Sequence, residues 1–178
     1  ALTSLTADII YRLDATKLVG ISGSRLLKED ERFTDFPTMN EGRTPPDLEK
    51  IVALEPDLVI GAEGFSDQTL SKLEELGIKT IATNIDSWIS LKEVTKTLAS
   101  AIGSDPDPLL KEYDTYLPNQ NNEKINLSTL VLVSRQPILA PNKNSWAGDL
   151  LSQFPIKNLA AQLQGSSPVG GYVTLSPE

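Results

Sequence analysis

Short apolar runs alternate with longer helical segments along most of this 178-residue chain. Strands are expected at residues 17–21, 56–61, 78–83 and 129–134, where aliphatic and β-branched residues gather. A segment of helical period follows most of these runs. Because a helix after each strand returns the chain to the same end of the sheet, the strands must run parallel. The alternation therefore predicts an α/β fold in which helices cover parallel sheets.

The helices are predicted from their caps and their inner apolar stripes. A cap at residues 66–67 begins a helix that turns Leu70, Leu73 and Leu76 inward, and Gly77 stands where a helix ends. Other helices are expected to begin near Ser4, Asp47, Ser87, Pro106 and Ser145.

The chain is expected to divide into three parts. Residues 1–104 form an N-terminal α/β lobe, residues 105–124 supply a helix and a polar linker, and residues 125–178 open a second α/β lobe. We expect the second lobe to be incomplete in this sequence. The first three residues resemble the end of a strand already in progress, so the chain is interpreted as a fragment.

Two absent residue types narrow the chemistry. The chain has no His and no Cys, which excludes a Ser-His-Asp triad, an imidazole base, a thiolate nucleophile, a disulfide and a His-rich metal site. The sequence also lacks a P-loop and a nucleophile elbow. We therefore expect no catalytic residues, no bound metal of its own and no cofactor.

The charge balance narrows the partners. Lys and Arg number 16 against 24 Asp and Glu, which gives a net charge of −8. Nucleic acid or an anionic membrane would need a basic surface, so neither is expected as a partner. No apolar run approaches the roughly 20 residues of a membrane span, and no signal peptide is visible.

Side chains that follow the predicted strands are the candidates for a site, because ligands of open parallel sheets bind at the carboxyl ends of the strands. These candidates are Ser4, Arg25, Glu63, Phe65, Trp88, Arg135 and Trp146. Arginines, aromatic rings and small polar groups suit binding better than proton transfer. Each has an ordinary alternative: a Trp that begins an amphipathic helix is commonly a core residue, and a surface Arg is commonly solvated or ion-paired. Their shared position at strand ends favours a binding site.

Residues 44–60 (TPPDLEKIVALEPDLVI) carry a family resemblance. The segment resembles the N-L-E-x-I-x-A-L-x-P-D-L-V-I stretch of the class III periplasmic substrate-binding proteins, which serve ABC importers of cobalamin, ferric siderophores and haem. Further motifs of that family are similar, in the same order, to residues 76–80 (LGIKT), 141–151 (PNKNSWAGDLL) and 171–178 (GYVTLSPE). The last of these echoes residues 45–60, as expected for two related lobes.

The resemblance implies an architecture and a biological role. It implies two Rossmann-like lobes with parallel sheets, joined by a bridging helix at residues 106–117, with a ligand cleft between them. It implies a monomeric binding protein rather than an enzyme, whose partners are an ABC transporter permease with its ATPase and a small-molecule metal chelate. It also implies a periplasmic location, or a lipid anchor on the extracytoplasmic side of the bacterial inner membrane.

Four residues are matched to the family's functional positions. Arg43 and Tyr172 match cleft positions that are aromatic in the cobalamin-binding members. Arg43 replaces a Trp, which disfavours cobalamin and favours an anionic chelate such as a carboxylate or catecholate ferric siderophore. Tyr172 keeps the ring. Haem is less expected in a chain without His, although a Tyr such as Tyr172 can also serve as a haem ligand. Glu49 and Glu178 match the glutamates, one per lobe, with which the family docks on arginines of its permease.

Two other interpretations stay open. A cytoplasmic α/β enzyme or chelatase-like protein would use carboxylates, yet Glu63 is the one acidic residue found at the predicted strand ends. A ligand-sensing lobe that serves a different partner is the second alternative. Neighbouring genes for a permease and an ATPase would favour the importer interpretation over both.

Overall fold

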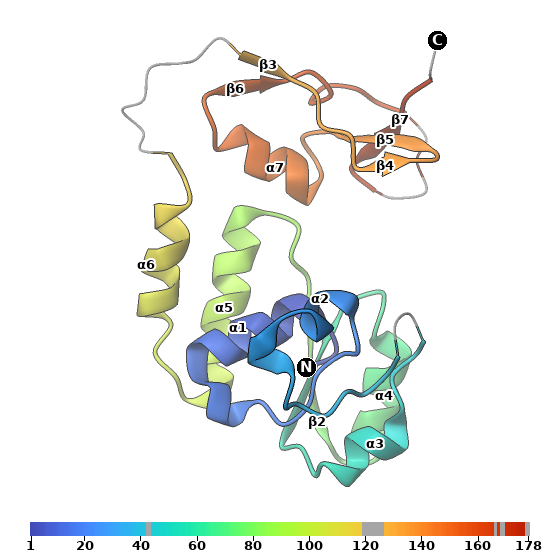
Figure 1. Cartoon of the computed structure of the whole chain (residues 1–178), viewed down its shortest axis with the longest axis vertical. Coiled ribbons are helices and arrows are strands. Elements are labelled where there is room, and N and C mark those ends of the chain that lie inside the picture. Colours follow the sequence, from blue (N-terminus) through green and yellow to red (C-terminus); the bar gives the residue numbers. More distant parts are fainter. Residues whose placement is uncertain (42–43, 119–126, 166, 168–169, 177–178) are drawn as a thin grey trace. The chain divides into compact units, whose positions relative to one another are not determined.

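The computed structural model describes residues 1–41, 44–118, 127–165, 167 and 170–176 (Figure 1). The described elements, with η for short 3₁₀ helices, are α1 (Ser4–Asp14), η1 (Ala15–Lys17), α2 (Arg25–Lys28), η2 (Glu31–Phe33), α3 (Leu48–Ala53), β1 (Leu58–Ala62), α4 (Asp67–Glu75), β2 (Lys79–Thr83), α5 (Trp88–Ile102), α6 (Asp107–Thr115), β3 (Leu127–Thr129), β4 (Ser134–Arg135), β5 (Ile138–Pro141), α7 (Trp146–Ser152), β6 (Ile156–Asn158) and β7 (Tyr172–Thr174).

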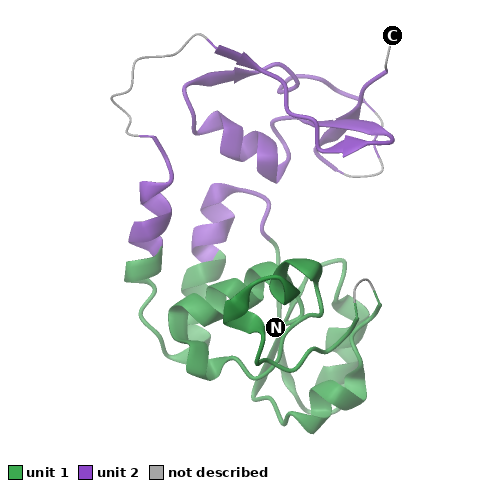
Figure 2. Cartoon of the chain, in the orientation of Figure 1, with its two compact units in different colours: residues 1–84, 94–109 green, residues 85–93, 110–178 purple. Residues whose placement is uncertain are grey.

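The chain forms two compact units (Figure 2). Unit 1 comprises Ala1–Asn84 and Val94–Leu109, and unit 2 comprises Ile85–Glu93 and Leu110–Glu178. The division therefore passes through α5 and α6 and does not fall in a linker. The division expected from the sequence, at residues 104 and 124, stays a prediction.

A parallel sheet forms the centre of unit 1. β1 pairs with β2 in parallel over its whole length. The start of the chain lies beside β1, because the N–H of Leu2 donates to the carbonyl of Ile60 at 2.8 Å. Ile21 makes a parallel bridge with Thr38. The predicted α/β class with parallel strands is confirmed.

The core of unit 1 includes a cluster that α3 and α4 form with the sheet and the segment before α3. Figure 1 shows these two helices together on one side of the β1–β2 sheet and α1 on the other. The buried members of the cluster are Leu2, Met39, Ile51, Val59, Leu70 and Leu73. Leu76, which the sequence placed in the core, is 62% exposed because it is the C-cap of α4 and lies beyond the turn that faces the sheet. Gly77 follows with φ of 81°, the left-handed conformation that ends the helix.

The segment 22–41 contains two short helices, α2 and η2, that the sequence analysis does not predict. Side-chain oxygens of Ser24 and Asp30 cap α2 and η2. Phe33 is buried, and its ring centroid lies 5.1 Å from that of Tyr11 in α1. Helices of three or four residues are too short to show a hydrophobic period, so the sequence pattern does not reveal them.

The described residues of unit 2 form two small sheets. β3 pairs with β6 in parallel, and β5 lies between β4 and β7 in an antiparallel sheet. The single buried strand predicted at residues 129–134 is wrong, because β3 ends at Thr129 and β4 begins at Ser134. β4 forms a tight hairpin with β5, so β4 belongs to a different sheet and does not continue β3. The apolar run between them connects the two sheets, and its Leu132 is 56% exposed.

α7 packs directly on the loop that precedes it. Ser145 caps the helix as predicted, since its hydroxyl accepts a hydrogen bond from the N–H of Gly148 at 3.0 Å. A Cβ atom at Gly148 would lie only 1.7 Å from the carbonyl oxygen of Asn142. Glycine is therefore required for this approach, which also fixes the start of α7 where Trp146 is placed.

Candidate functional site

Two loops that follow sheet segments of unit 1 meet at one place. Ser4 opens α1 after the first segment, and Ser24 caps α2 after the second. The hydroxyl of Ser4 donates to the hydroxyl of Ser24 at 2.9 Å. Ser4 therefore lies beside the loop that carries Arg25, as the parallel topology predicts. The role of Ser4 in binding a ligand stays a prediction.

Arg25 is ion-paired on the surface of α2. Its Nε donates to Oε1 of Glu29 at 2.7 Å, and the two side chains are 88% and 62% exposed. A pair this exposed contributes little stability, so the guanidinium can turn to another anion at small cost. Its charge is nevertheless balanced locally, which is the ordinary alternative that the sequence analysis gave for a surface Arg.

The turn after β1 presents Glu63 and Phe65 to solvent. Phe65 is 95% exposed. The turn is fixed by Gly64, which has φ of 78° and whose N–H donates to the carboxylate of Asp67 at 2.9 Å. The hydroxyl of Ser66 accepts from the N–H of Ala62 at 3.1 Å. Single exposed apolar residues are common, so the exposure of Phe65 alone does not indicate a site. Its position at a strand end is the reason to keep it as a candidate.

Trp88 and Trp146 lie together in unit 2. Their rings stack with centroids 6.2 Å apart and an interplanar angle of 22°. The backbone N–H of Trp88 donates to Asp149 at 2.7 Å, and its ring meets the ring of Tyr113 edge-on at 5.9 Å. Trp88 is 9% exposed, and its indole N–H has no hydrogen-bond partner among the described residues. Trp88 thus serves in packing, and the half-buried Trp146 is the more accessible ring.

Arg135 and Tyr172 occupy the two outer strands of the antiparallel sheet in unit 2. Arg135 is exposed at an open pocket of about 380 Å³ whose other lining residues are Leu132, Val133, Ser134 and Ile138. Tyr172 is half-buried at the start of β7. The N–H of Asn142 donates to the carbonyl of Gly171 at 2.9 Å, so Tyr172 adjoins the loop that leads to α7. Their roles toward a ligand stay predictions.

Three further predicted positions concern the cleft and the docking surface. Arg43 and Glu178 lie outside the described residues. Glu49 is exposed in the first turn of α3, where its N–H donates to the capping carboxylate of Asp47 at 3.0 Å. An acidic residue in a first turn is favoured by the helix dipole alone, so the placement of Glu49 does not by itself indicate docking.

A pocket that the sequence analysis missed opens between α1, α2 and η2. Its volume is about 620 Å³, and its lining comprises Thr3, Ser4, Leu5, Asp8, Leu26, Leu27, Asp30, Arg32 and Phe33. Ser4 is the one predicted site residue in this lining. The available sequence signal was a leucine placed two residues after each of two helix caps, at positions 5 and 26.

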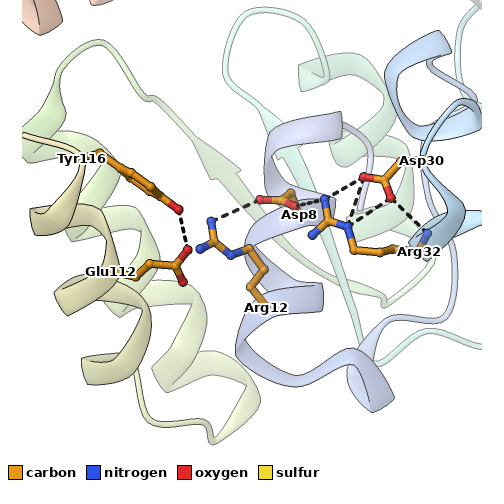
Figure 3. Close-up of polar contacts among 6 residues, drawn as sticks. All are labelled: Asp8, Arg12, Asp30, Arg32, Glu112 and Tyr116. Atoms are coloured by element: carbon orange, nitrogen blue, oxygen red, sulfur yellow. Dashed lines mark hydrogen bonds and ion pairs between the residues drawn. The ribbon is translucent and has the colours of Figure 1, made fainter.

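The charged side chains in the wall of this pocket are paired with one another (Figure 3). The Arg32 guanidinium lies 2.7 Å from an Asp30 oxygen and 2.9 Å from an Asp8 oxygen, and 5.5 Å from the centroid of the Tyr11 ring. Hydrogen bonds from Arg32 hold the pKa of Asp30 below its usual value, and the same contact raises the pKa of Arg32. Asp30 and Arg32 therefore stay ionised at neutral pH and compensate each other's charge.

Clusters of potential metal ligands and membrane-spanning helices are both absent from the described residues. Within them, no group of three His, Cys, Asp or Glu is placed to hold a metal ion. In the same part of the chain, no helix combines the length and the apolar character that crossing a bilayer requires.

Comparison with known proteins decides the family. The family model described as "Periplasmic binding protein" matches residues 1–172. The chain belongs to the periplasmic binding protein family. The resemblance to the class III members, which rested on residues 44–60 and on three later motifs, is thereby confirmed.

Solved structures share the fold of this periplasmic binding protein. The periplasmic vitamin B12 binding protein BtuF of Vibrio cholerae is 20% identical, with a TM-score of 0.71 over 99% of this chain and 69% of its own. The periplasmic haem binding protein HutB of Vibrio cholerae is 20% identical, with a TM-score of 0.75 over 97% and 67%. An ABC transporter substrate-binding protein from Listeria monocytogenes is 22% identical, with a TM-score of 0.72 over 98% and 67%. The chain thus spans about two thirds of their length, and no curated protein sequence matches it.

Proposed function

We propose that this periplasmic binding protein is the substrate-binding component of an ABC importer and that its cargo is a metal chelate, a ferric siderophore or a related chelate such as cobalamin. The family match over residues 1–172 carries the proposal. The vitamin B12 and haem binding proteins of similar fold support the ligand class, as does a possible iron-binding protein of similar fold from Staphylococcus epidermidis. The protein would act as a monomer on the extracytoplasmic side of the inner membrane, free or lipid-anchored, with a permease and its ATPase as partners.

The side chains at the strand ends of unit 1 support binding rather than acid–base catalysis. The Arg25 guanidinium and the hydroxyl of Ser4 can form hydrogen bonds with oxygen atoms of a ligand. A general acid needs a pKa near the working pH, whereas Arg32 lowers the pKa of Asp30. The carboxylate enzyme considered from the sequence therefore gains no support from Asp30, which lines the pocket between α1, α2 and η2.

Fluorescence titration tests the proposal. Trp88 and Trp146 are the only tryptophans in the sequence. Ferric chelates, cobalamin and haem absorb light in the range of Trp emission, so a bound chelate quenches the fluorescence even without touching either ring. Saturable quenching by one of these probes at submicromolar concentration is expected, with free tryptophan amide as the control for light absorption. A folded protein whose emission shows no saturable response to any probe would contradict the proposal.

Docking on a permease makes a separate prediction for Glu49. Because Glu49 is exposed and is not a member of the buried cluster of unit 1, Glu49→Ala should leave chelate affinity unchanged. Loss of its charge should slow cellular uptake about tenfold if arginines of the permease face it. Glu75→Ala, an exposed glutamate at the end of α4, is the matched control and should transport normally. Normal uptake with both Glu49 and Glu178 replaced would refute the docking assignment.

A further inference from the structure

We propose that the pocket between α1, α2 and η2 receives an apolar face of the bound chelate, and that Leu5 and Leu26 form the contact. This inference rests on the proposed function and narrows its ligand class. The chelate would present a flat ring system or aromatic groups, rather than a surface made of carboxylates alone.

Leu5 and Leu26 lie next to buried residues but are not themselves buried in the core. Leu26 is 74% exposed and Leu5 is 45% exposed, and both line the pocket. Next to Leu26, Leu27 is 4% exposed and anchors α2, and Phe33 is 2% exposed beneath the same pocket. Leu5 and Leu26 therefore stand on a fixed backbone. An apolar ligand surface that covers them would remove their side chains from water, which is favourable through the hydrophobic effect.

The hydroxyl groups of the pocket rim already have partners. Ser24 accepts a hydrogen bond from Ser4 and a second one from the N–H of Leu27 at 3.3 Å. A ligand oxygen that accepts a hydrogen bond from Ser4 would have to displace Ser24, because the single hydroxyl hydrogen of Ser4 is already donated. The volume of about 620 Å³ lies in the range of about 300–1,000 Å³ found for small-molecule sites, so a part of a chelate fits.

The charges of the pocket also disfavour a carboxylate-rich ligand. Arg32 is the pocket's one cation among the described lining residues, and it lies between Asp8 and Asp30. A carboxylate that approaches Arg32 would compete with both aspartates and would be repelled by them. A neutral apolar face meets neither cost, which makes it the better match to this pocket.

Substitution of Leu26 tests the inference. The wild type, Leu26→Ser, Leu5→Ser and Leu26→Met are titrated with haem, cobalamin, an iron(III) catecholate chelate and ferric citrate. When a ligand covers part of a Leu side chain, the apolar area removed from water raises the affinity about tenfold. Leu26→Ser should therefore raise the Kd of the preferred chelate about tenfold, Leu5→Ser should raise it less, and Leu26→Met should restore it. Leu76→Ser, at a leucine of similar exposure outside the pocket, should change the Kd less than twofold.

The outcomes separate this inference from the proposed function. A wild type that binds a ring-bearing chelate, with the Leu26→Ser variant tenfold weaker, supports both. If the chelate binds equally well to the wild type and to Leu26→Ser, or if ferric citrate is the preferred probe, the inference is overturned and the importer role stands. If the folded wild type binds none of the four probes, both fail. Because Leu26 is largely exposed, its replacement should leave the unfolding midpoint unchanged, which circular dichroism checks.

Discussion

Gly148→Ala tests whether the start of α7 packs directly on backbone. An added Cβ would lie 1.7 Å from the carbonyl oxygen of Asn142 and 2.6 Å from its carbon. Both are backbone atoms, so no rotamer change relieves the overlap. To reach even the 3.0 Å below which real Cβ contacts are essentially never seen, the loop and the helix must separate by about 1.3 Å.

Two effects of opposite sign determine how much Gly148→Ala changes the free energy of unfolding. In a helix without such a contact, Ala is more favourable than Gly by about 1 kcal/mol. Overpacking costs about 1–3 kcal/mol, and displacement of the Gly148 N–H from the Ser145 hydroxyl removes a cap of about 1 kcal/mol. The overlap should win, so Gly148→Ala should lower the free energy of unfolding by about 2 kcal/mol.

Urea denaturation followed by Trp fluorescence measures this change, because Trp146 lies in the same helix and stacks on Trp88. Gly165→Ala is the matched control in unit 2, since a Cβ there would meet its nearest atoms at an ordinary 3.9 Å. The control should move the free energy of unfolding by less than about 0.5 kcal/mol. A Gly148→Ala variant as stable as the wild type, or more stable, would refute the packing argument.

Two more predictions concern unit 1. Leu73→Ala removes a fully buried side chain from the core between α4 and the sheet, and should lower the free energy of unfolding by about 3 kcal/mol. Leu76→Ala, at a leucine that is 62% exposed, should cost less than about 1 kcal/mol, and equal losses in urea denaturation would contradict the assignment of the core. Asp30→Asn keeps an oxygen to cap η2 but removes the charge that pairs with Arg32, whose hydrogen bonds lower the pKa of Asp30. A lowered pKa stabilises the fold above the unfolded-state pKa of about 4, and this stabilisation is lost as the pH falls through the folded value. The variant should therefore be less stable than the wild type at pH 7 and match it in strong acid, whereas a difference that does not depend on pH would refute the role of the ion pair.

Much of unit 1 was predictable because its signals are local. The cap at Asp47, the inner Leu70 and Leu73 of α4 and the stop at Gly77 each act within a few residues, and each has its expected place. The apolar run at 130–133 shows the limit of such signals. Its composition is that of a buried strand, but burial depends on which strand lies beside it, and the hairpin of β4 with β5 decided that.

The site divides in the same way. The meeting of Ser4 with Ser24 follows from parallel topology, which places successive strand ends at one edge. The pairing of Arg32 with Asp8 could not be predicted, because it joins η2 to α1 across a contact that exists only in the folded unit. Nor could the sequence decide between core and cleft for Trp88, since both positions give an amphipathic helix that begins with an aromatic ring.

Native mass spectrometry of the chain, after incubation with a mixture of haem, cobalamin, an iron(III) catecholate chelate and ferric citrate, tests the central claim most directly. The account predicts that each chain binds one chelate molecule with an aromatic or ring-shaped face. The mass of that chelate should remain added to the mass of the chain after gel filtration. A chain that circular dichroism shows to be folded and that retains only its own mass would contradict the assignment of this protein as a chelate carrier.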